Sequence, residues 1–344
     1  MNIARRKTAT LHSFFHLIAI GFFVLAVQGC TVLKALHLLP EERVSVKGKD
    51  YVVVIAGWQD SLESLAEEYY GQESDAWRIA EFNNISEVHH NDEIVIPLVD
   101  PYPSAIYSDS YQTVPILCYH RFGKGHIKLS VSEKNFQEQM KYLYDNGYEV
   151  ISLKQFVDFI EKGKRVPQKS VVITIDDGYR STYTVAYPIL KKYNFPATVF
   201  LYTDFMGARD ALKWDQIKSM YNSGLIDMQP HSKSHPNMAI QKTNESSTDY
   251  KVRVREEVSV PGGHITQKIK APLHTFAYPY GDTNEEVIGE LKAKKYSLGV
   301  TVIPGVNSSF SYPYMLKRTM IFGDHTLKQF AQELTTSRDI ASSE

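Results

Sequence analysis

Two short segments of the sequence place ionisable side chains directly after apolar runs. Asp176 and Asp177 follow residues 171–175, a β-branched run that we expect to be a buried strand. His231 and His235 follow a later apolar run, and histidines four positions apart can share one face of a helical turn. Two imidazoles and one carboxylate leave a coordination position open, as in catalytic Zn²⁺ sites. Either pair alone also fits solvated surface groups, but the combination predicts a catalytic metal site.

These side chains need a scaffold, and from residue 114 onward apolar strand patterns alternate with helical patterns. The strand candidates are residues 116–119, 149–152, 171–175, 197–202, 225–228, 274–278, 298–302 and 318–322. The helical candidates are residues 132–146, 153–162, 185–193, 215–223, 284–294 and 326–335. Such alternation is typical of a parallel α/β barrel or a doubly wound sheet. Catalytic residues of barrels collect at the C-terminal ends of strands, which is where both pairs fall.

Three segments resemble the motifs of the polysaccharide deacetylase family, carbohydrate esterase family 4. They are residues 174–179, which contain the aspartates, residues 231–235, which contain the histidines, and residues 276–281. The resemblance covers residues 113–335 and implies a distorted (β/α) barrel with fewer than eight complete strand-helix units. It also implies a hydrolase that removes N-acetyl groups from a polysaccharide.

The resemblance assigns a role to each polar residue of the first two motifs. Asp177, His231 and His235 would hold Zn²⁺ or another divalent transition metal, which polarises the acetyl carbonyl and activates water. Asp176, beside the metal but not bound to it, would be the general base.

The third motif and a tryptophan would complete the site. The backbone N–H of Tyr280 would donate to the oxyanion, because the preceding Pro279 fixes the turn and has no N–H of its own. Tyr278 and Pro279 are expected to contact substrate. Trp214 resembles the aromatic wall of the family, although a packed tryptophan at a helix start fits equally well.

Two departures from the family pattern change the assignment of the remaining roles. The arginine that usually begins the third motif is replaced by Ala277, and the C-terminal Leu-x-His motif is absent. Arg318, at a predicted strand start, could instead pair with Asp176. His120 ends the first predicted strand in a context similar to poly-N-acetylglucosamine deacetylases, and there it would be the general acid. A structural histidine that caps this strand is the alternative.

The N-terminal residues resemble a lipoprotein signal. Arg5, Arg6 and Lys7 precede a mostly apolar stretch that ends at Cys30. We therefore expect residues 1–29 to be a signal peptide and residues 30–49 a tether with a lipidated Cys30. An ordinary signal sequence or an uncleaved anchor, in either case with an incidental cysteine, is the alternative. This reading predicts an exported protein, lipid-anchored to a membrane of the bacterial cell envelope.

A second, smaller unit precedes the barrel. Residues 50–98 read as strand, helix, helix, strand and resemble the lysin motif (LysM), a family that binds glycans containing N-acetylglucosamine. A small structural appendage is the alternative. Residues 99–112 are expected to be a linker, and residues 336–344 a frayed tail.

Composition narrows the possible partners. The chain has 344 residues and a formal net charge of -1, so nothing suggests a nucleic-acid partner. Its two cysteines are Cys30 and Cys118, and Cys118 lies in an apolar run where we expect a buried small side chain. We expect a deacetylase of an N-acetylglucosamine polymer, first peptidoglycan and second a poly-N-acetylglucosamine-like exopolysaccharide. A non-catalytic glycan-binding scaffold and an O-acetyl esterase are the alternatives, and the oligomeric state stays open.

Overall fold

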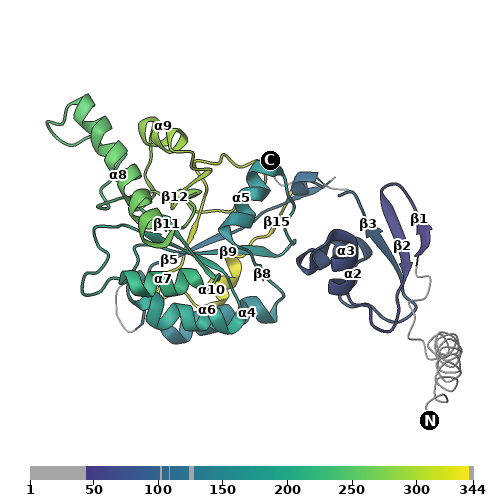
Figure 1. Cartoon of the computed structure of the whole chain (residues 1–344). Helices are drawn as coiled ribbons and strands as arrows, with labels where there is room; N and C mark the ends of the chain where they lie inside the picture. Colours follow the sequence, from purple (N-terminus) through teal and green to yellow (C-terminus); the bar gives the residue numbers. More distant parts are fainter. Residues whose placement is uncertain (1–43, 101–102, 108, 124–127, 341–344) are drawn as a thin grey trace, which may run out of the picture. The chain divides into compact units, whose positions relative to one another are not determined.

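The computed structural model describes residues 44–100, 103–107, 109–123 and 128–340. The chain divides into two compact units, residues 1–101 and 102–344, and each is described by itself (Figure 1). The predicted signal peptide and the predicted lipid site at Cys30 lie outside the described residues. Within the described ranges, no helix has the length and apolarity that a membrane span requires.

The first unit is a three-stranded antiparallel sheet covered by two helices. Its elements are β1 (Val44–Lys47), β2 (Tyr51–Ile55), α2 (Leu62–Tyr70), η1 (Glu73–Asp75), α3 (Ala76–Asn83) and β3 (Glu93–Pro97), with the strand order β1-β2-β3. Val52 and Val54 alternate into a core that also contains Leu65 and Ile79. The predicted strand-helix-helix-strand order is present. The structure adds β1, which lies in the segment predicted to be a tether and pairs with β2.

The second unit is built on a parallel sheet. Its strands are β5 (Ile116–Tyr119), β8 (Glu149–Val150), β9 (Ser170–Ile175), β10 (Ala197–Leu201), β11 (Ile226–Pro230) and β14 (Thr319–Met320). They follow the order β11-β10-β9-β5-β14, and β8 also pairs with β9. A separate parallel pair consists of β12 (Thr275–Ala277) and β13 (Leu298–Val300). This architecture confirms the predicted α/β fold of the distorted barrel type.

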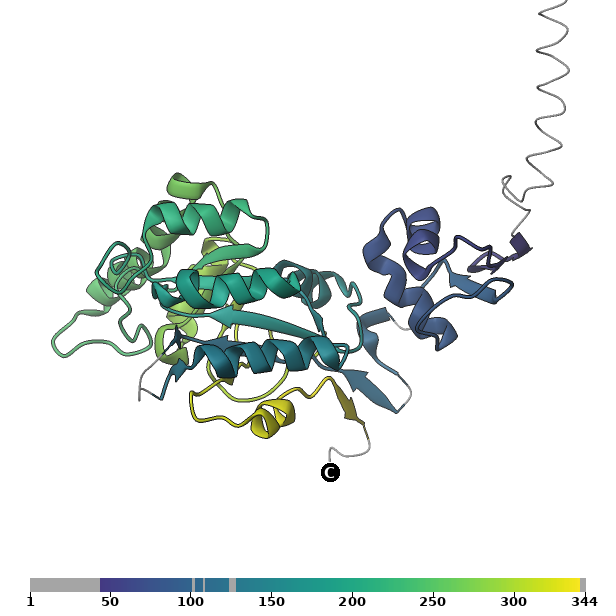
Figure 2. The same cartoon turned by 90° about the horizontal axis from the view of Figure 1, so that it is seen from below.

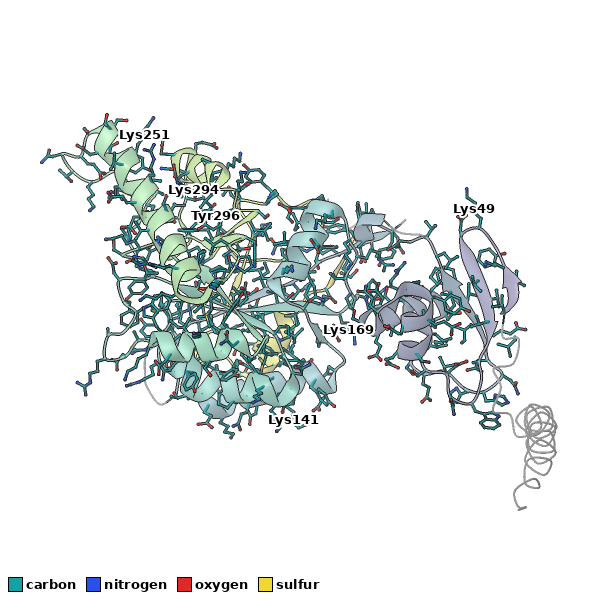
Figure 3. All side chains as sticks on the ribbon, in the orientation of Figure 1. Lys49, Lys141, Lys169, Lys251, Lys294 and Tyr296 are labelled. Atoms are coloured by element: carbon teal, nitrogen blue, oxygen red, sulfur yellow. The ribbon has the colours of Figure 1, made fainter. Side chains whose placement is uncertain are left out.

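Helices cover the strands of the second unit. They are α4 (Glu133–Asp145), α5 (Leu153–Lys162), α6 (Tyr187–Tyr193), α7 (Trp214–Asn222), α8 (Ser247–Ile269), α9 (Glu285–Ala293) and α10 (Leu327–Gln332), with shorter turns η2 (Pro103–Ala105), η3 (Thr182–Ala186) and η4 (Pro279–Gly281). Helices α4, α6 and α7 lie along one side of the sheet (Figures 1 and 2). Phe136 of α4, Leu190 of α6 and Ile217 of α7 share the main core with Ile173 of β9. The exposed Lys141 on α4 and Lys251 on α8 point outward on opposite sides of this unit (Figure 3).

Two elements differ from the sequence prediction. The 23-residue helix α8 contains Pro261, and its glycines hid the helical pattern. Gly262 packs closely there, because an added Cβ would lie 2.7 Å from Leu273 Cδ1 and would displace that side chain. The predicted tail is also partly ordered, since β15 (Ser337–Asp339) pairs with β4 (Ser110–Gln112) of the predicted linker. Two further short strands, β6 (Arg121–Phe122) and β7 (Ser130–Val131), pair with each other.

Candidate metal centre and active site

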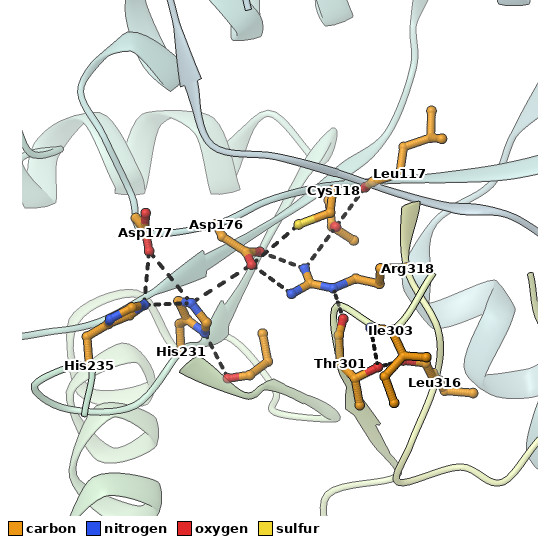
Figure 4. Close-up of polar contacts among 12 residues, drawn as sticks. Leu117, Cys118, Asp176, Asp177, His231, His235, Thr301, Ile303, Leu316 and Arg318 are labelled. Atoms are coloured by element: carbon orange, nitrogen blue, oxygen red, sulfur yellow. Dashed lines mark hydrogen bonds and ion pairs between the residues drawn. The ribbon is translucent and has the colours of Figure 1, made fainter. Parts of the chain in front are cut away.

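The two aspartates diverge because the chain turns sharply at the end of β9. All six residues of this strand are buried, and Asp177 and Gly178 then adopt the left-handed region with φ of 75° and 76°. A Cβ at Gly178 would lie 2.7 Å from Met206 Cε and 2.8 Å from Leu201 Cδ2, and glycine adopts this φ without strain, so the turn favours glycine. Asp177 therefore faces the histidines, whereas Asp176 faces Arg318 (Figure 4).

Asp177, His231 and His235 form a compact set of potential ligands. The Nε2 atoms of the two histidines are 3.2 Å apart, and they lie 3.6 Å and 3.4 Å from Asp177 Oδ1, respectively. Ligand atoms bound at about 2.0–2.1 Å around a tetrahedral Zn²⁺ lie about 3.3–3.4 Å apart, so the three distances fit such an ion. Asp177 Oδ1 is buried and has no hydrogen-bond partner among the described residues, as expected of a vacant lone pair aimed at a cation. These residues therefore fit a divalent metal.

The environment of His231 favours a neutral imidazole with its lone pair facing the site. Nδ1 lies 2.8 Å from the carbonyl oxygen of Ala277, which assigns the N–H to Nδ1 and leaves Nε2 as the acceptor. Burial lowers the pKa of His231 to about 3. Burial together with the charge of Asp176 raises the pKa of Asp177 to about 7 in the metal-free protein. These buried ligand atoms would be compensated by a bound cation.

The histidines do not lie on a helix, so the predicted helical turn is wrong. They belong to an irregular loop after β11, in which Ser232 and His235 have φ of 71° and 61°. The hydroxyl of Ser232 accepts the N–H of His235 at 2.9 Å and closes the loop. A turn with two left-handed residues brings the rings together, which the spacing alone does not reveal.

Asp176 is held by a buried bidentate ion pair with Arg318. The two guanidinium nitrogens donate to Asp176 Oδ1 and Oδ2 at 2.7 Å each, and Nε donates to the carbonyl oxygen of Thr301 at 2.7 Å. Burial opposes ionisation of Asp176, but the charge of Arg318 outweighs it and holds the pKa of this carboxyl well below its usual range. Arg318 directly precedes strand β14. The arginine that is absent from position 277 is thus replaced, next to Asp176, by an arginine from a distant part of the sequence.

His120 and Cys118 also lie close to Asp176. His120 follows β5, and one ligand-type atom each of Cys118, His120 and Asp176 lies within 4.8 Å of the others. Burial lowers the pKa of His120 below its ordinary value, and the charge of Asp176 opposes this shift. Cys118 is buried as expected, but its thiol also donates to Asp176 Oδ2 at 3.5 Å, a contact that the sequence did not suggest.

Aromatic side chains surround His235. Tyr280 is 61% exposed, and its ring meets that of His235 edge-on at a centroid distance of 4.9 Å. Tyr202 lies 5.1 Å from the same ring. Tyr280 has φ of 61°, within the turn η4. The contact of Tyr202 with His235 was missed because no sequence pattern marks an aromatic residue at the end of a strand as part of a site.

The three residues predicted to contact substrate are buried or partly buried. Tyr278 is fully buried and donates through its hydroxyl to the carbonyl oxygen of Tyr314 at 2.9 Å, so its side chain packs in the core. Pro279 is also buried. Trp214 begins α7, is partly buried and packs against the main core.

Comparison with known proteins adds independent support for the family. The family model described as polysaccharide deacetylase matches residues 163–299. YxkH of Bacillus subtilis (strain 168), whose name places it among polysaccharide deacetylases, is 31% identical over 212 residues, which are 60% of this chain and 71% of that protein. The chain therefore belongs to the polysaccharide deacetylase family, a family of hydrolases.

Other relatives agree with this result. The poly-β-1,6-N-acetyl-D-glucosamine N-deacetylase of Staphylococcus aureus (strain MRSA252) is 29% identical over 209 residues, 58% of this chain and 72% of that protein. The enzyme of the same name from Escherichia coli (strain K12) is 26% identical over 245 residues, and the match spans only 36% of its length. A structure of the Streptococcus pyogenes deacetylase PplD in complex with acetate has a TM-score of 0.60 and 25% identity, and it covers 65% of this chain and 98% of that one.

Proposed function

We propose that the protein removes N-acetyl groups from N-acetylglucosamine units of a cell-envelope polysaccharide, with a divalent metal held by Asp177, His231 and His235. The observation that carries this proposal is the spacing of the three ligand atoms, 3.2 to 3.6 Å, beside the ion-paired Asp176. Two imidazoles and one carboxylate favour Zn²⁺.

Each side chain of the site has a distinct role in this proposal. A bound divalent ion would polarise the acetyl carbonyl and activate water. Asp176, kept ionised by Arg318, accepts the proton of the attacking water as general base. His120, close to Asp176, gives a proton to the departing amine, and the backbone N–H of Tyr280 donates to the oxyanion.

The polymer is proposed from the relatives and from the first barrel strand. Two relatives are named for poly-β-1,6-N-acetyl-D-glucosamine, and the position of His120 resembles such enzymes. We therefore propose a poly-N-acetylglucosamine-like polysaccharide as the first candidate substrate and peptidoglycan as the second. The sequence alone had favoured the opposite order. Residues 50–98 are proposed as a LysM glycan-binding unit. The 74%-exposed Trp58, stacked on His90 at 3.9 Å, offers an aromatic face suited to a sugar ring.

Export and anchoring complete the proposal. The apolar N-terminal stretch that ends at Cys30 supports a lipid anchor in the bacterial cell envelope, where such polymers are found.

Acetate release from a soluble form tests the function. Poly-β-1,6-N-acetylglucosamine oligomers and peptidoglycan are compared side by side, with and without a chelator. We expect acetate from the oligomers, loss of release on chelation, and recovery with Zn²⁺ or Co²⁺. Release only from an O-acetylated substrate would favour the esterase alternative, and glycan binding without any release would favour the scaffold.

A further inference from the structure

The loop that carries both histidines, residues 231–235, depends on neighbours for its backbone hydrogen bonds. The carbonyl oxygens of Ser232 and Lys233 accept the N–H groups of Thr203 and Asp204 at 3.3 Å and 2.9 Å. An irregular loop cannot satisfy all its own donors, and each buried N–H requires an acceptor. The N–H groups in the middle of the loop therefore need a partner from another element.

Glu257 of helix α8 supplies that partner. Its Oε2 accepts the N–H of Lys233 at 2.9 Å and that of Ser234 at 2.8 Å, and its Oε1 accepts the hydroxyl of Ser234 at 2.6 Å. The residue is 6% exposed, and it forms no ion pair within the part of the chain that the structure describes. All three bonds to this buried carboxylate thus go to one loop. Bonds of this charge-assisted kind are short and strong.

We infer that Glu257 is a positioning residue of the metal site, which holds the loop in the shape that presents His235. The inference rests on the metal site of the proposed function. The loop needs such support because Ser232 and His235 both adopt left-handed backbone conformations, which persist only where their surroundings impose them. Glu257 lies 22 residues after His235 in the sequence and acts through the backbone, without touching the ligand atoms.

Two substitutions separate hydrogen-bond reach from charge. Glu257→Gln keeps the length of the side chain: its amide oxygen can accept both N–H groups, and its NH₂ can donate to Ser234. Glu257→Asp keeps the charge but is one methylene shorter. We expect Glu257→Asp to lower Zn²⁺ affinity about 10–100-fold, the usual weight of groups that orient a metal ligand, and Glu257→Gln to stay within about 3-fold of the natural protein.

The experiment is competition of the purified protein with a chromophoric Zn²⁺ chelator, combined with the visible spectrum of the Co²⁺ form. Glu256→Ala, an exposed neighbour on α8, is the matched control and should change neither. If the Asp variant does not fold by circular dichroism, Ser234→Ala serves instead, since it removes one of the three bonds and should give a smaller loss in the same direction. Equal affinity in the natural protein and the Asp variant, or in the Ser234 variant where that one is used, would overturn the inference. A loss with Gln but not with Asp would also overturn it, because charge would then be the cause. If the natural protein bound no divalent ion at all, the proposed function would fail as well, so the two failures are distinguishable.

Discussion

At the scale of single residues, the left-handed backbone of Asp177 gives the two neighbouring aspartates different surroundings. Asp177 has φ of 75°, which turns its carboxylate to the histidines and leaves Asp176 against Arg318. The sequence indicated the aspartates and histidines because they follow apolar runs. It could only suggest Arg318, since a contact across 142 positions depends on how strands β9 and β14 are placed. The contact between Cys118 and Asp176 had no sequence signal.

The adjacent aspartates should respond differently to substitution by asparagine. Asp176→Asn removes the proposed base but no ligand, so turnover should be abolished while metal stays bound. It should also lower the free energy of unfolding by about 3–5 kcal/mol, because Arg318 is left as a buried charge without its partner. Asp177→Asn should lose both metal and activity. Elemental analysis, acetate release and thermal melts measure these effects, and equal metal loss in both variants would contradict the assigned roles.

His120 should behave as an acid that matters most for poor leaving groups. His120→Ala should reduce turnover of the amide about 10²–10⁴-fold, the usual weight of general acid catalysis. Metal content should stay constant, and an activated aryl acetate should be much less affected because its leaving group needs no proton. His264→Ala, at an exposed position of α8, is the control. Near-full amide hydrolysis by His120→Ala would place the acid elsewhere.

At the scale of elements, periodicity in the sequence indicated most strands and helices but not the connections that carry the chemistry. Strand β5 matches its predicted range, because an uninterrupted apolar run between turn signals leaves little choice. Helix α8 was missed because Pro261, Gly262 and Gly263 are residues that usually interrupt helices. Gly262 is present there because of a tertiary contact, its close packing against Leu273, which the local sequence does not reveal. The loop of residues 231–235 was misjudged because positive φ at Ser232 has no residue-type signature.

The turn after β9 gives a prediction for an element boundary. Gly178→Ala would place a methyl group within 2.8 Å of Met206 and Leu201 at φ of 76°, so these side chains or the turn that aims Asp177 must shift. We expect a loss of about 1–3 kcal/mol in the free energy of unfolding and reduced metal content. Gly263→Ala is the matched control, because it lies in α8 with open space around it and should be neutral or stabilising by up to about 1 kcal/mol. Calorimetry measures the stability of both variants, and elemental analysis measures their metal content. Equal stability and equal metal content in Gly178→Ala and Gly263→Ala would contradict the steric argument.

At the scale of the whole molecule, two compact units and an N-terminal cysteine serve different tasks in the proposal. The second unit holds all the proposed catalytic residues, and the first has its own core. Cys30→Ser should release the protein from the membrane fraction or leave it unprocessed, because the acylated side chain is removed. Fractionation of cells followed by immunoblotting measures this, and unchanged membrane retention of a processed protein would contradict the lipid anchor.

Removal of the first unit should separate polymer binding from catalysis. The deletion has to remove residues 44–98 and not only 50–98. Strand β1 pairs with β2, so a deletion that removed β2 alone would leave β1 without its partner strand. The truncated protein should hydrolyse short oligomers at the rate of the full chain, since Asp176, Asp177, His231 and His235 all belong to the second unit. On insoluble glycan it should bind more weakly, because a second binding site on the same chain raises the local concentration of the substrate. Co-sedimentation with poly-N-acetylglucosamine and with peptidoglycan, run beside acetate release from oligomers, measures both properties.

Trp58→Ala in the full chain is the finer variant, since this exposed side chain can be removed without loss of the core. Equal sedimentation of the truncated and full proteins would remove the case for a glycan-binding unit while leaving the deacetylase proposal intact. Weaker sedimentation with only one of the two polymers would instead show which glycan the first unit prefers.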